Sequence, residues 1–306
     1  MAGKPLDQLK NLTDPGGCHV IDLPSRIWVF GGFCEKTGPT LSLRDAFWRA
    51  SMEHHPAPAW FIDLDRPEDH AGWLEHSGYS DLLEFERDAC YLAKAIILFA
   101  ESPGAHAELG ALAIDEALLS RLAVVVQHRH TQGANVNSFL NLGPLRRVEA
   151  IGCLCVIGDE HLSLSPTDFL EITEAVAAWL PAKHKREKLH LSNRTHRMLL
   201  IADLIDLLIV SSEPDLVEAT AHFGIEMTSE ELKKSLGLLK FLQLVGMYRA
   251  GSTRYWVRHD AEGGPWIDYT ATPDAPNFER ARFKIKANEI IHADARLRSI
   301  YERGKQ

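Results

Sequence analysis

The sequence predicts an α/β protein in which a parallel-sheet domain is followed by a mainly helical domain. Apolar, β-prone runs alternate with helical patterns over the first 180 residues, which is typical of a parallel sheet with helices on both faces. The charge balance changes sign near residue 180, because residues 1–180 carry a net charge of −12 and residues 181–306 a net charge of +3. We therefore expect domains at 1–182 and 183–306, joined by the polar, basic stretch 181–188.

Runs of apolar residues place the strands of the first domain, and apolar residues at helical spacing place its helices. Strands are expected at 26–30, 58–63, 95–100, 122–126 and 152–157. Helices are expected at 41–53, 81–93, 107–119 and 167–180. The stretch 131–147 is expected to be a long loop after a parallel strand, and such loops often carry function.

The second domain has the element order of a winged helix. A very apolar helix is expected at 193–210, a helix that begins near Pro214 at 215–222, and a third at 228–244 that opens on the capping-box residues Thr228 and Glu231. A hairpin around Gly251 follows, and 277–306 is expected to be helical.

Composition excludes several classes of protein. A chain of 306 residues with 45% apolar residues can bury real cores. No apolar run is long enough for a membrane span, the first 24 residues lack the layout of a signal peptide, and the net charge of −9 argues against non-specific nucleic-acid binding by the whole chain. An odd number of cysteines without a paired framework suits a reducing cytoplasm. The spacing of the cysteines and histidines fits no metal motif. Cys153 and Cys155 are expected to lie in the core.

Glu108 is the strongest candidate for a catalytic residue. It follows the buried strand at 95–100 and the turn formed by Ser102, Pro103 and Gly104, where we expect a left-handed or ligand-approaching glycine. If the helix begins at 107, Glu108 lies in its first turn, at the edge of the sheet where α/β proteins bind ligands. The helix dipole would keep its carboxylate ionised, although glutamate is also common in first turns for stability alone.

Other polar residues are open to two interpretations. Gly31 and Gly32 end a strand and would let a ligand approach the backbone. Asn141 would bind a ribose hydroxyl or a base edge and Arg146 a phosphate, or both belong to ordinary turn chemistry. The acidic residues of the helix at 81–93 are expected to form a solvated face; these are Glu84, Glu86 and Asp88.

These motifs together resemble a known family. The stretches 30–32, 96–104, 108–111 and 141–146, with Glu86, resemble nucleoside 2-deoxyribosyltransferase-like proteins, and most closely the effectors of bacterial retrons, which join such a domain to a C-terminal winged helix. The resemblance covers about half of the chain. Ser102 stands where the loop of the transferases usually opens with an aspartate, so hydrolysis stays open beside base exchange.

The resemblance implies cleavage of an N-glycosidic bond by a toxic effector of anti-phage defence. Glu108 would attack the anomeric carbon, and Glu86 would position a sugar hydroxyl or a water. Backbone groups at Gly31, Gly32, Ser102 and Gly104, beside Pro103, would hold sugar or phosphate. NAD is the expected substrate, without a further cofactor or metal; the expected partners are the retron reverse transcriptase and its RNA–DNA hybrid (msDNA), together with further copies of the chain.

The second domain would then contact nucleic acid. Phosphates would meet basic side chains of its third helix and hairpin, although acidic neighbours weaken this interpretation and a purely protein-binding role is open. The basic candidates are Lys233, Lys234, Lys240, Arg249, Arg254 and Arg258.

Two other functions fit the same patterns. A metabolic nucleoside 2-deoxyribosyltransferase would exchange bases but leaves the winged helix without a purpose. A nucleotide-sensing winged-helix regulator would bind ligand without turnover and bind duplex DNA with a steep salt dependence.

Overall fold

The protein is described by a computed structural model that covers residues 4–35, 37–70, 72, 75, 78–160, 162–180, 186–259, 264–274 and 277–304. The chain forms two compact units. Unit 2 comprises 25–73 and 93–182, and unit 1 comprises 1–24, 74–92 and 183–306. One boundary coincides with the predicted change at 182/183, but 1–24 and 74–92 group with the second part of the chain. Residues 181–185 of the expected linker lie outside the described residues.

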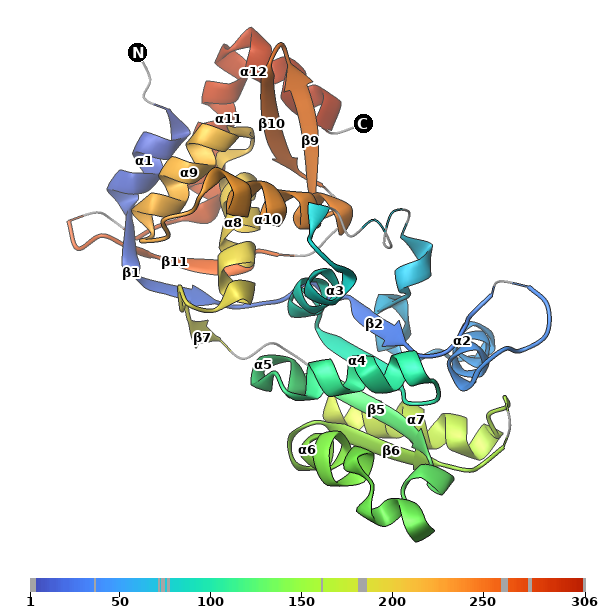
Figure 1. Ribbon diagram of the computed structural model, residues 1–306. Coiled ribbons are helices and arrows are strands. Elements are labelled where there is room, and N and C mark those ends of the chain that lie inside the picture. The colour runs from blue at the N-terminus through green and yellow to red at the C-terminus, as the bar shows by residue number, and fades with distance from the viewer. Residues whose placement is uncertain are drawn as a thin grey trace. The chain divides into compact units, whose positions relative to one another are not determined.

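Unit 2 is built on a five-stranded, fully parallel sheet (Figure 1). Its strands are β2 (Ile27–Phe30), β3 (Leu64–Asp65), β4 (Ala95–Phe99), β5 (Leu122–Gln127) and β6 (Cys153–Ile157). The order across the sheet is β3-β2-β4-β5-β6. Counted from β2, this is the 2-1-3-4-5 order of doubly wound sheets, in which the chain reverses direction of winding between β2 and β4.

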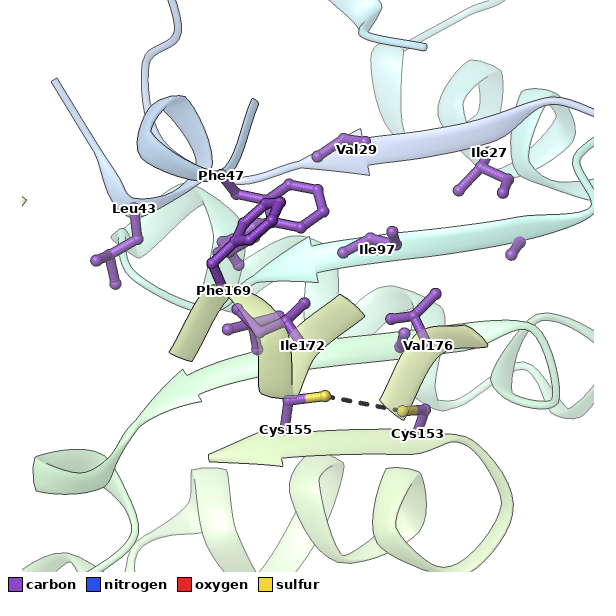
Figure 2. Packing of buried hydrophobic residues seen from close by; sticks show 14 of the residues in the cluster. Ile27, Val29, Leu43, Phe47, Ile97, Cys153, Cys155, Phe169, Ile172 and Val176 are labelled. Atoms are coloured by element: carbon purple, nitrogen blue, oxygen red, sulfur yellow. Dashed lines mark hydrogen bonds between the residues drawn. The ribbon is translucent and has the colours of Figure 1, made fainter. Parts of the chain in front are cut away.

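Helices cover both faces of this sheet, as predicted. On one face lie α2 (Leu43–Glu53) and α7 (Pro166–Trp179), and the other face contacts α4 (Pro103–Ala113) and α6 (Arg146–Ile151). Figure 2 shows the first interface, where Phe47 of α2 and Phe169 of α7 have ring centroids 5.7 Å apart. Cys153 and Cys155 are buried in this core with sulfurs 3.8 Å apart, so their predicted core position is confirmed.

Three predicted elements of unit 2 differ from the structure. The stretch 58–63 is a 3₁₀ turn (Ala59–Asp63) that leads into the short β3, because Trp60 and Phe61 are adjacent residues that both pack into the core and strand alternation would separate them. The helix expected at 107–119 begins earlier and breaks into α4 and α5 (Glu116–Leu119), with Asp115 capping the second. The expected loop at 131–147 contains helical turns at Gly133–Asn137 and Asn141–Leu145 that run into α6.

Unit 1 combines helices with two small antiparallel sheets. The first sheet, ordered β11-β1-β7, consists of β1 (Thr13–Val20), β7 (Glu187–Lys188) and β11 (Ile267–Ala271); the second, ordered β8-β10-β9, consists of β8 (Ser211–Ser212), β9 (Val245–Ala250) and β10 (Thr253–Arg258). Its helices are α1 (Pro5–Leu12), α3 (Leu82–Tyr91), α8 (Arg194–Leu208), α9 (Glu213–His222), α10 (Ser229–Phe241), α11 (Arg280–Ala293) and α12 (Ala295–Gly304).

The three predicted helices and the hairpin of the second part of the chain are present, although α10 ends at Phe241 and not at 244, and the helical stretch predicted at 277–306 is divided into α11 and α12. The central helix α8 is buried along nearly its whole length, and Pro214 lies in the first turn of α9. The capping box of Thr228 and Glu231 opens α10, and Gly251 turns the β9–β10 hairpin with a φ of 62°. The first strand and helix of unit 1, α1 and β1, were not predicted. No helix among the described residues is long and apolar enough to cross a bilayer.

The acidic residues of α3 do not form the solvated face that the sequence suggested. Glu84 pairs with Lys234 at 2.6 Å and with Arg194 at 3.4 Å. Asp88 is buried, receives a hydrogen bond from the Tyr79 hydroxyl at 3.0 Å and lies 3.3 Å from Arg194. Burial raises the pKa of Asp88, although Arg194 opposes this shift. The contacts of Glu84 and Asp88 with Arg194 and Lys234 anchor α3 in unit 1.

Candidate functional site

The candidate site lies where β2 and β4 end, at the point where the winding of the sheet reverses. Gly31 and Gly32 follow β2, and Glu101 and Ser102 follow β4. Because neighbouring parallel strands end at the same edge, these four residues lie at the place where doubly wound sheets bind their ligands. Gly31, Gly32 and Ser102 are predicted site residues, whereas no role is predicted for Glu101.

Glu101 organises this edge of the sheet. Its Oε1 accepts hydrogen bonds from the backbone N–H of Gly32 at 2.9 Å and Arg44 at 3.1 Å, and its Oε2 accepts one from Leu43 at 2.6 Å. Leu43 and Arg44 open α2, so the carboxylate occupies the N-terminus of that helix, where backbone donors and the helix dipole favour an anion. Glu101 therefore ties the turn after β2, the start of α2 and the end of β4 together.

The two glycines make room for this arrangement. Gly31 has a φ of 149°, and a Cβ there would lie 2.9 Å from Cβ of Phe99. A Cβ on Gly32 would lie 2.7 Å from Cβ of Ser42 and 3.1 Å from Oε1 of Glu101. A side chain at either position would therefore collide with its neighbours, and the N–H of Gly32 is donated to Glu101. Close packing thus requires glycine here, in addition to the predicted ligand contact.

We expect replacement of Glu101 by glutamine to loosen this edge. The amide would place an NH₂ group against backbone donors and remove the charge from the N-terminus of α2. A loss of about 1–3 kcal/mol in the stability of unit 2 is expected, because charge-assisted hydrogen bonds of this kind are worth that much. Amide hydrogen exchange at Gly32, Leu43 and Arg44 should become faster.

The matched control is Glu53→Gln, which changes an exposed carboxylate at the other end of α2. This variant should leave both the melting temperature and the exchange of the three amides close to those of the wild type. Equal exchange in the two variants would show that Glu101 does not hold the edge.

Glu108 is one turn further into its helix than the sequence suggested. Ser102 is the N-cap of α4, with its Oγ accepting a hydrogen bond from Ala105 N at 3.1 Å, and Pro103 and Gly104 form the first helical turn. Gly104 is helical, so the left-handed alternative is wrong, whereas the close approach of a ligand to its backbone stays a prediction. Glu108 lies in the second turn, half-buried, where the helix dipole contributes little.

Two histidines meet at the same edge. The rings of His106, in α4, and His130, after β5, have centroids 5.7 Å apart in an edge-to-face arrangement. Nε2 of His106 lies 3.1 Å from the carbonyl oxygen of Ala100. Burial lowers the pKa of His130, and the neighbouring Arg129 lowers it further, so the neutral form of His130 is favoured.

The segment after β5 is held together from within. The amide nitrogen of Asn141 lies 2.6 Å from the carbonyl oxygen of His130 and 2.8 Å from that of Asn135. The structure thus supports the turn-forming interpretation of Asn141. Arg146 is exposed at the first residue of α6. Among the described residues, no cluster of three or more histidine, cysteine or acidic side chains could hold a metal.

The predicted site residue Glu86 belongs to the other unit, and its role in the reaction stays a prediction. It lies half-buried on α3, which is part of unit 1. The site as unit 2 presents it therefore consists of Glu108 and the elements around Glu101.

The predicted basic residues of unit 1 fall into two groups. Lys234 pairs with Glu84 and lies 4.3 Å from the ring centroid of Tyr79. Arg254 donates one hydrogen bond to Glu213 at 3.0 Å and forms an ion pair with it at 2.6 Å, and Arg258 lies 3.2 Å from Asp206. These three residues are engaged within the unit. Lys233, Lys240 and Arg249 are exposed.

Two of the three exposed residues share one side of a helix. Lys233 and Lys240 are seven residues apart on α10 and so lie on one side of that helix, away from its buried Leu232, Leu236 and Leu239. Arg249 lies on the following strand, β9.

Comparisons with known proteins cover both units. A family model described as STM3845 retron effector protein matches residues 40–247. The "Retron Ec86 putative ribosyltransferase/DNA-binding protein" of Escherichia coli is 33% identical over 100 residues, which is 32% of this chain and 32% of that protein. The aligned stretch thus spans about a third of the relative's length. Since the family model matches more than half of the sequence, the chain belongs to the STM3845 retron effector protein family.

Proposed function

We propose that the protein is a toxic effector of a retron anti-phage system that hydrolyses the N-glycosidic bond of NAD, with Glu108 as the nucleophile. The observation that carries this proposal is the position of Glu108, half-buried on the helix that directly follows β4 at the switch point of the sheet. The name of the Escherichia coli relative, a putative ribosyltransferase, supports chemistry at an anomeric carbon.

The reaction would proceed in two displacements. One carboxylate oxygen of Glu108 attacks C1′ of the nicotinamide ribose, and the bond to the pyridinium nitrogen breaks with its electron pair going to that nitrogen. Water then attacks C1′, the carboxylate leaves, and the water's proton passes to solvent. Covalent capture divides one difficult step into two easier ones.

NAD suits a site with one carboxylate at the reacting carbon. Its leaving group is a pyridinium ion that departs as neutral nicotinamide, so the first step needs no general acid. A neutral nucleoside base leaves as an anion unless it is protonated, and a second acid would then be required. This difference favours NAD over nucleosides as the substrate of the site in unit 2.

Chromatography of NAD and of a nucleoside mixture, after incubation with the chain alone and with its retron partners, tests the proposal. Nicotinamide and ADP-ribose as products would support it, and reaction in ¹⁸O-labelled water should place the label on the anomeric hydroxyl. Exchange of bases among nucleosides would instead establish the transferase alternative. Binding of NAD without turnover in both preparations would favour a nucleotide sensor.

We further propose that unit 1 contains a winged helix that contacts the retron's RNA–DNA hybrid (msDNA), in a complex with the retron reverse transcriptase and further copies of the chain. Three helices, α8 to α10, precede a hairpin whose second strand also pairs with β8, the element order of that module. Lys233, Lys240 and Arg249 supply the exposed charge, and the relative's name includes DNA binding.

The combined replacement of Lys233, Lys240 and Arg249 by glutamine should weaken binding to an RNA–DNA hybrid. Each lost phosphate contact is expected to reduce the slope of log K against log salt by about 0.9, because fewer counterions are released. Fluorescence anisotropy with a labelled hybrid at several salt concentrations measures this slope.

A second triple variant controls for net charge. Glutamine in place of the exposed Arg282, Lys286 and Arg298 removes the same charge from α11 and α12. Its salt slope should stay that of the wild type. Identical slopes in both triple variants would show that the surface of α10 and β9 is not the contact.

A further inference from the structure

Unit 1 contains a cavity that the proposed function does not use. Its volume is about 370 Å³, within the range of small-molecule sites. It is formed at the end of α8, against β10, α11 and α12, and it has both charged and apolar walls; among the lining residues are Asp206, Ile209, Val257, Arg258, Lys284 and Tyr301.

The charged wall carries an excess of positive charge. The carboxylate of Asp206 accepts hydrogen bonds from Lys284 at 2.7 Å and from Arg280 at 2.9 Å. It also forms an ion pair with Arg258 at 3.2 Å. Arg280 also binds the fully buried Asp203, so three cations share two carboxylates. Asp206 is the one acidic side chain among the described residues that line the cavity. An anion there would balance the remaining charge.

Two of the cations can reach a ligand. Lys284 and Arg258 line the cavity, and their side chains keep 38% and 20% of their exposure. Both present N–H donors, the groups that bind carboxylates and phosphates. Arg258 is also held over the ring of Trp266, 4.9 Å from its centroid, so its guanidinium is fixed before any ligand arrives.

The apolar wall includes a strained residue. Ile209 follows the end of α8 with φ 67° and ψ −53°, and Val210 N donates to the carbonyl oxygen of Leu208 at 2.7 Å. This is the rare form of the γ-turn, at a β-branched residue for which positive φ is costly. Such strain is found where the surrounding structure serves a site. Ile209 and Val257 line this wall together with the ring of Tyr301.

We propose that this cavity binds a small organic anion, with its carboxylate or phosphate at Lys284 and Arg258 and its apolar body against Ile209, Val257 and Tyr301. The shared chemistry is one oxyanion on an apolar or ring-shaped body small enough for the cavity. This site lies wholly in unit 1 and is independent of the glycosidase proposed for unit 2. A ligand there would stabilise the folded unit and so link its stability to a metabolite.

Isothermal titration of the full chain tests the site with two charged probes and their neutral partners. Adenosine monophosphate is compared with adenosine, and 4-hydroxybenzoate with 4-hydroxybenzyl alcohol, so that the panel separates phosphate from carboxylate. Inorganic phosphate alone tests whether the organic body matters. Each titration is repeated with Lys284→Met and with the control Lys286→Met, an exposed neighbour on α11 that does not line the cavity.

We expect one of the two anions to bind with saturation, its neutral partner and inorganic phosphate to bind more weakly, and Lys284→Met to weaken binding about tenfold or more, as the loss of a charged hydrogen bond does. Lys284→Met should fold, because Asp206 keeps Arg258 and Arg280. Because Lys284 belongs to unit 1, a loss of binding in Lys284→Met but not in Lys286→Met assigns the ligand to this cavity and not to the site in unit 2. The proposal is overturned if neither anion binds at millimolar concentration, or if Lys284→Met binds as tightly as Lys286→Met.

Discussion

Replacement of Glu108 by glutamine is expected to lower the release of nicotinamide from NAD by about a thousandfold or more, the scale of loss when a nucleophile is removed. The amide has nearly the shape of the carboxylate but does not attack C1′. It also lacks the negative charge that stabilises the oxocarbenium ion that develops there. Initial rates at saturating NAD, with the nicotinamide separated by chromatography, measure the effect.

The expected loss lies in kcat rather than in KM. Glutamine fills the same half-buried position in the second turn of α4, so the surroundings that bind substrate should persist. A reaction that loses kcat with KM nearly unchanged has lost an interaction of the transition state. In cells that express the chain without its retron partners, the same variant should relieve toxicity.

Glu116→Gln is the matched control, because Glu116 is an exposed glutamate in the first turn of the neighbouring α5. It should keep the wild-type rate and the wild-type melting temperature. A Glu108→Gln chain that retained full turnover would end the proposal for this residue, and its melting temperature would show that the fold was intact.

The fold of both units could be predicted from the sequence where apolar patterns are long and regular. The strands β4 and β5 are continuous buried runs, and α8 is so apolar that only a central position fits it. The prediction was wrong at 58–63, because a short apolar run is typical of a buried strand but also occurs in other structures. Here Trp60 and Phe61 enter the same core from a 3₁₀ turn.

The membership of elements in each compact unit could not be predicted, since it depends on contacts between distant parts of the chain. From its position in the sequence, the segment at 74–92 is predicted to belong to the first domain. In the structure its Asp88 and Glu84 pair with Arg194 and Lys234, more than a hundred residues later. No local pattern carries that information.

The site was found in outline because its edge of the sheet can be located from strand ends alone. Glu101 was missed as an organising residue although it directly follows a buried strand. The three donors that it binds, Gly32, Leu43 and Arg44, are 57 to 69 residues away in sequence. The beginning of α4 was predicted too late in the sequence for a local reason. Ser102 followed by Pro103 is a good N-cap and first turn, but Gly104 is typical of a turn and so favoured a later start of the helix.

Replacement of Arg280 by methionine is expected to destabilise unit 1 by about 3–5 kcal/mol, the cost of leaving a buried charge without its partner. Asp203 is fully buried on α8, and Arg280 of α11 is the cation that pairs with it among the described residues. Asp203 also accepts hydrogen bonds from the backbone N–H groups of Trp266 at 3.0 Å and Ile267 at 3.4 Å. Thermal and denaturant unfolding of the full chain, followed by tryptophan fluorescence, measure the loss.

Two further variants separate the loss of the ion pair from the loss of packing. Arg282→Met changes an exposed arginine two residues away on α11 and should leave stability unchanged. Asp203→Asn combined with Arg280→Met removes the stranded charge and should recover part of the lost free energy. If the double variant were no more stable than Arg280→Met alone, packing and not charge would explain the loss.

The loss of stability in Arg280→Met should depend on pH, because Asp203 is buried. Burial raises the pKa of Asp203 even with Arg280 beside it, so the folded state binds a proton there more tightly than the unfolded chain does. Such a group favours the folded state at low pH, and this contribution is lost as the pH rises through the folded pKa. Without Arg280 the pKa should rise further, because the main opposing charge is gone. The stability difference between wild type and Arg280→Met should therefore shrink as the pH is lowered from neutrality, since protonation of Asp203 removes the unpaired charge that causes it.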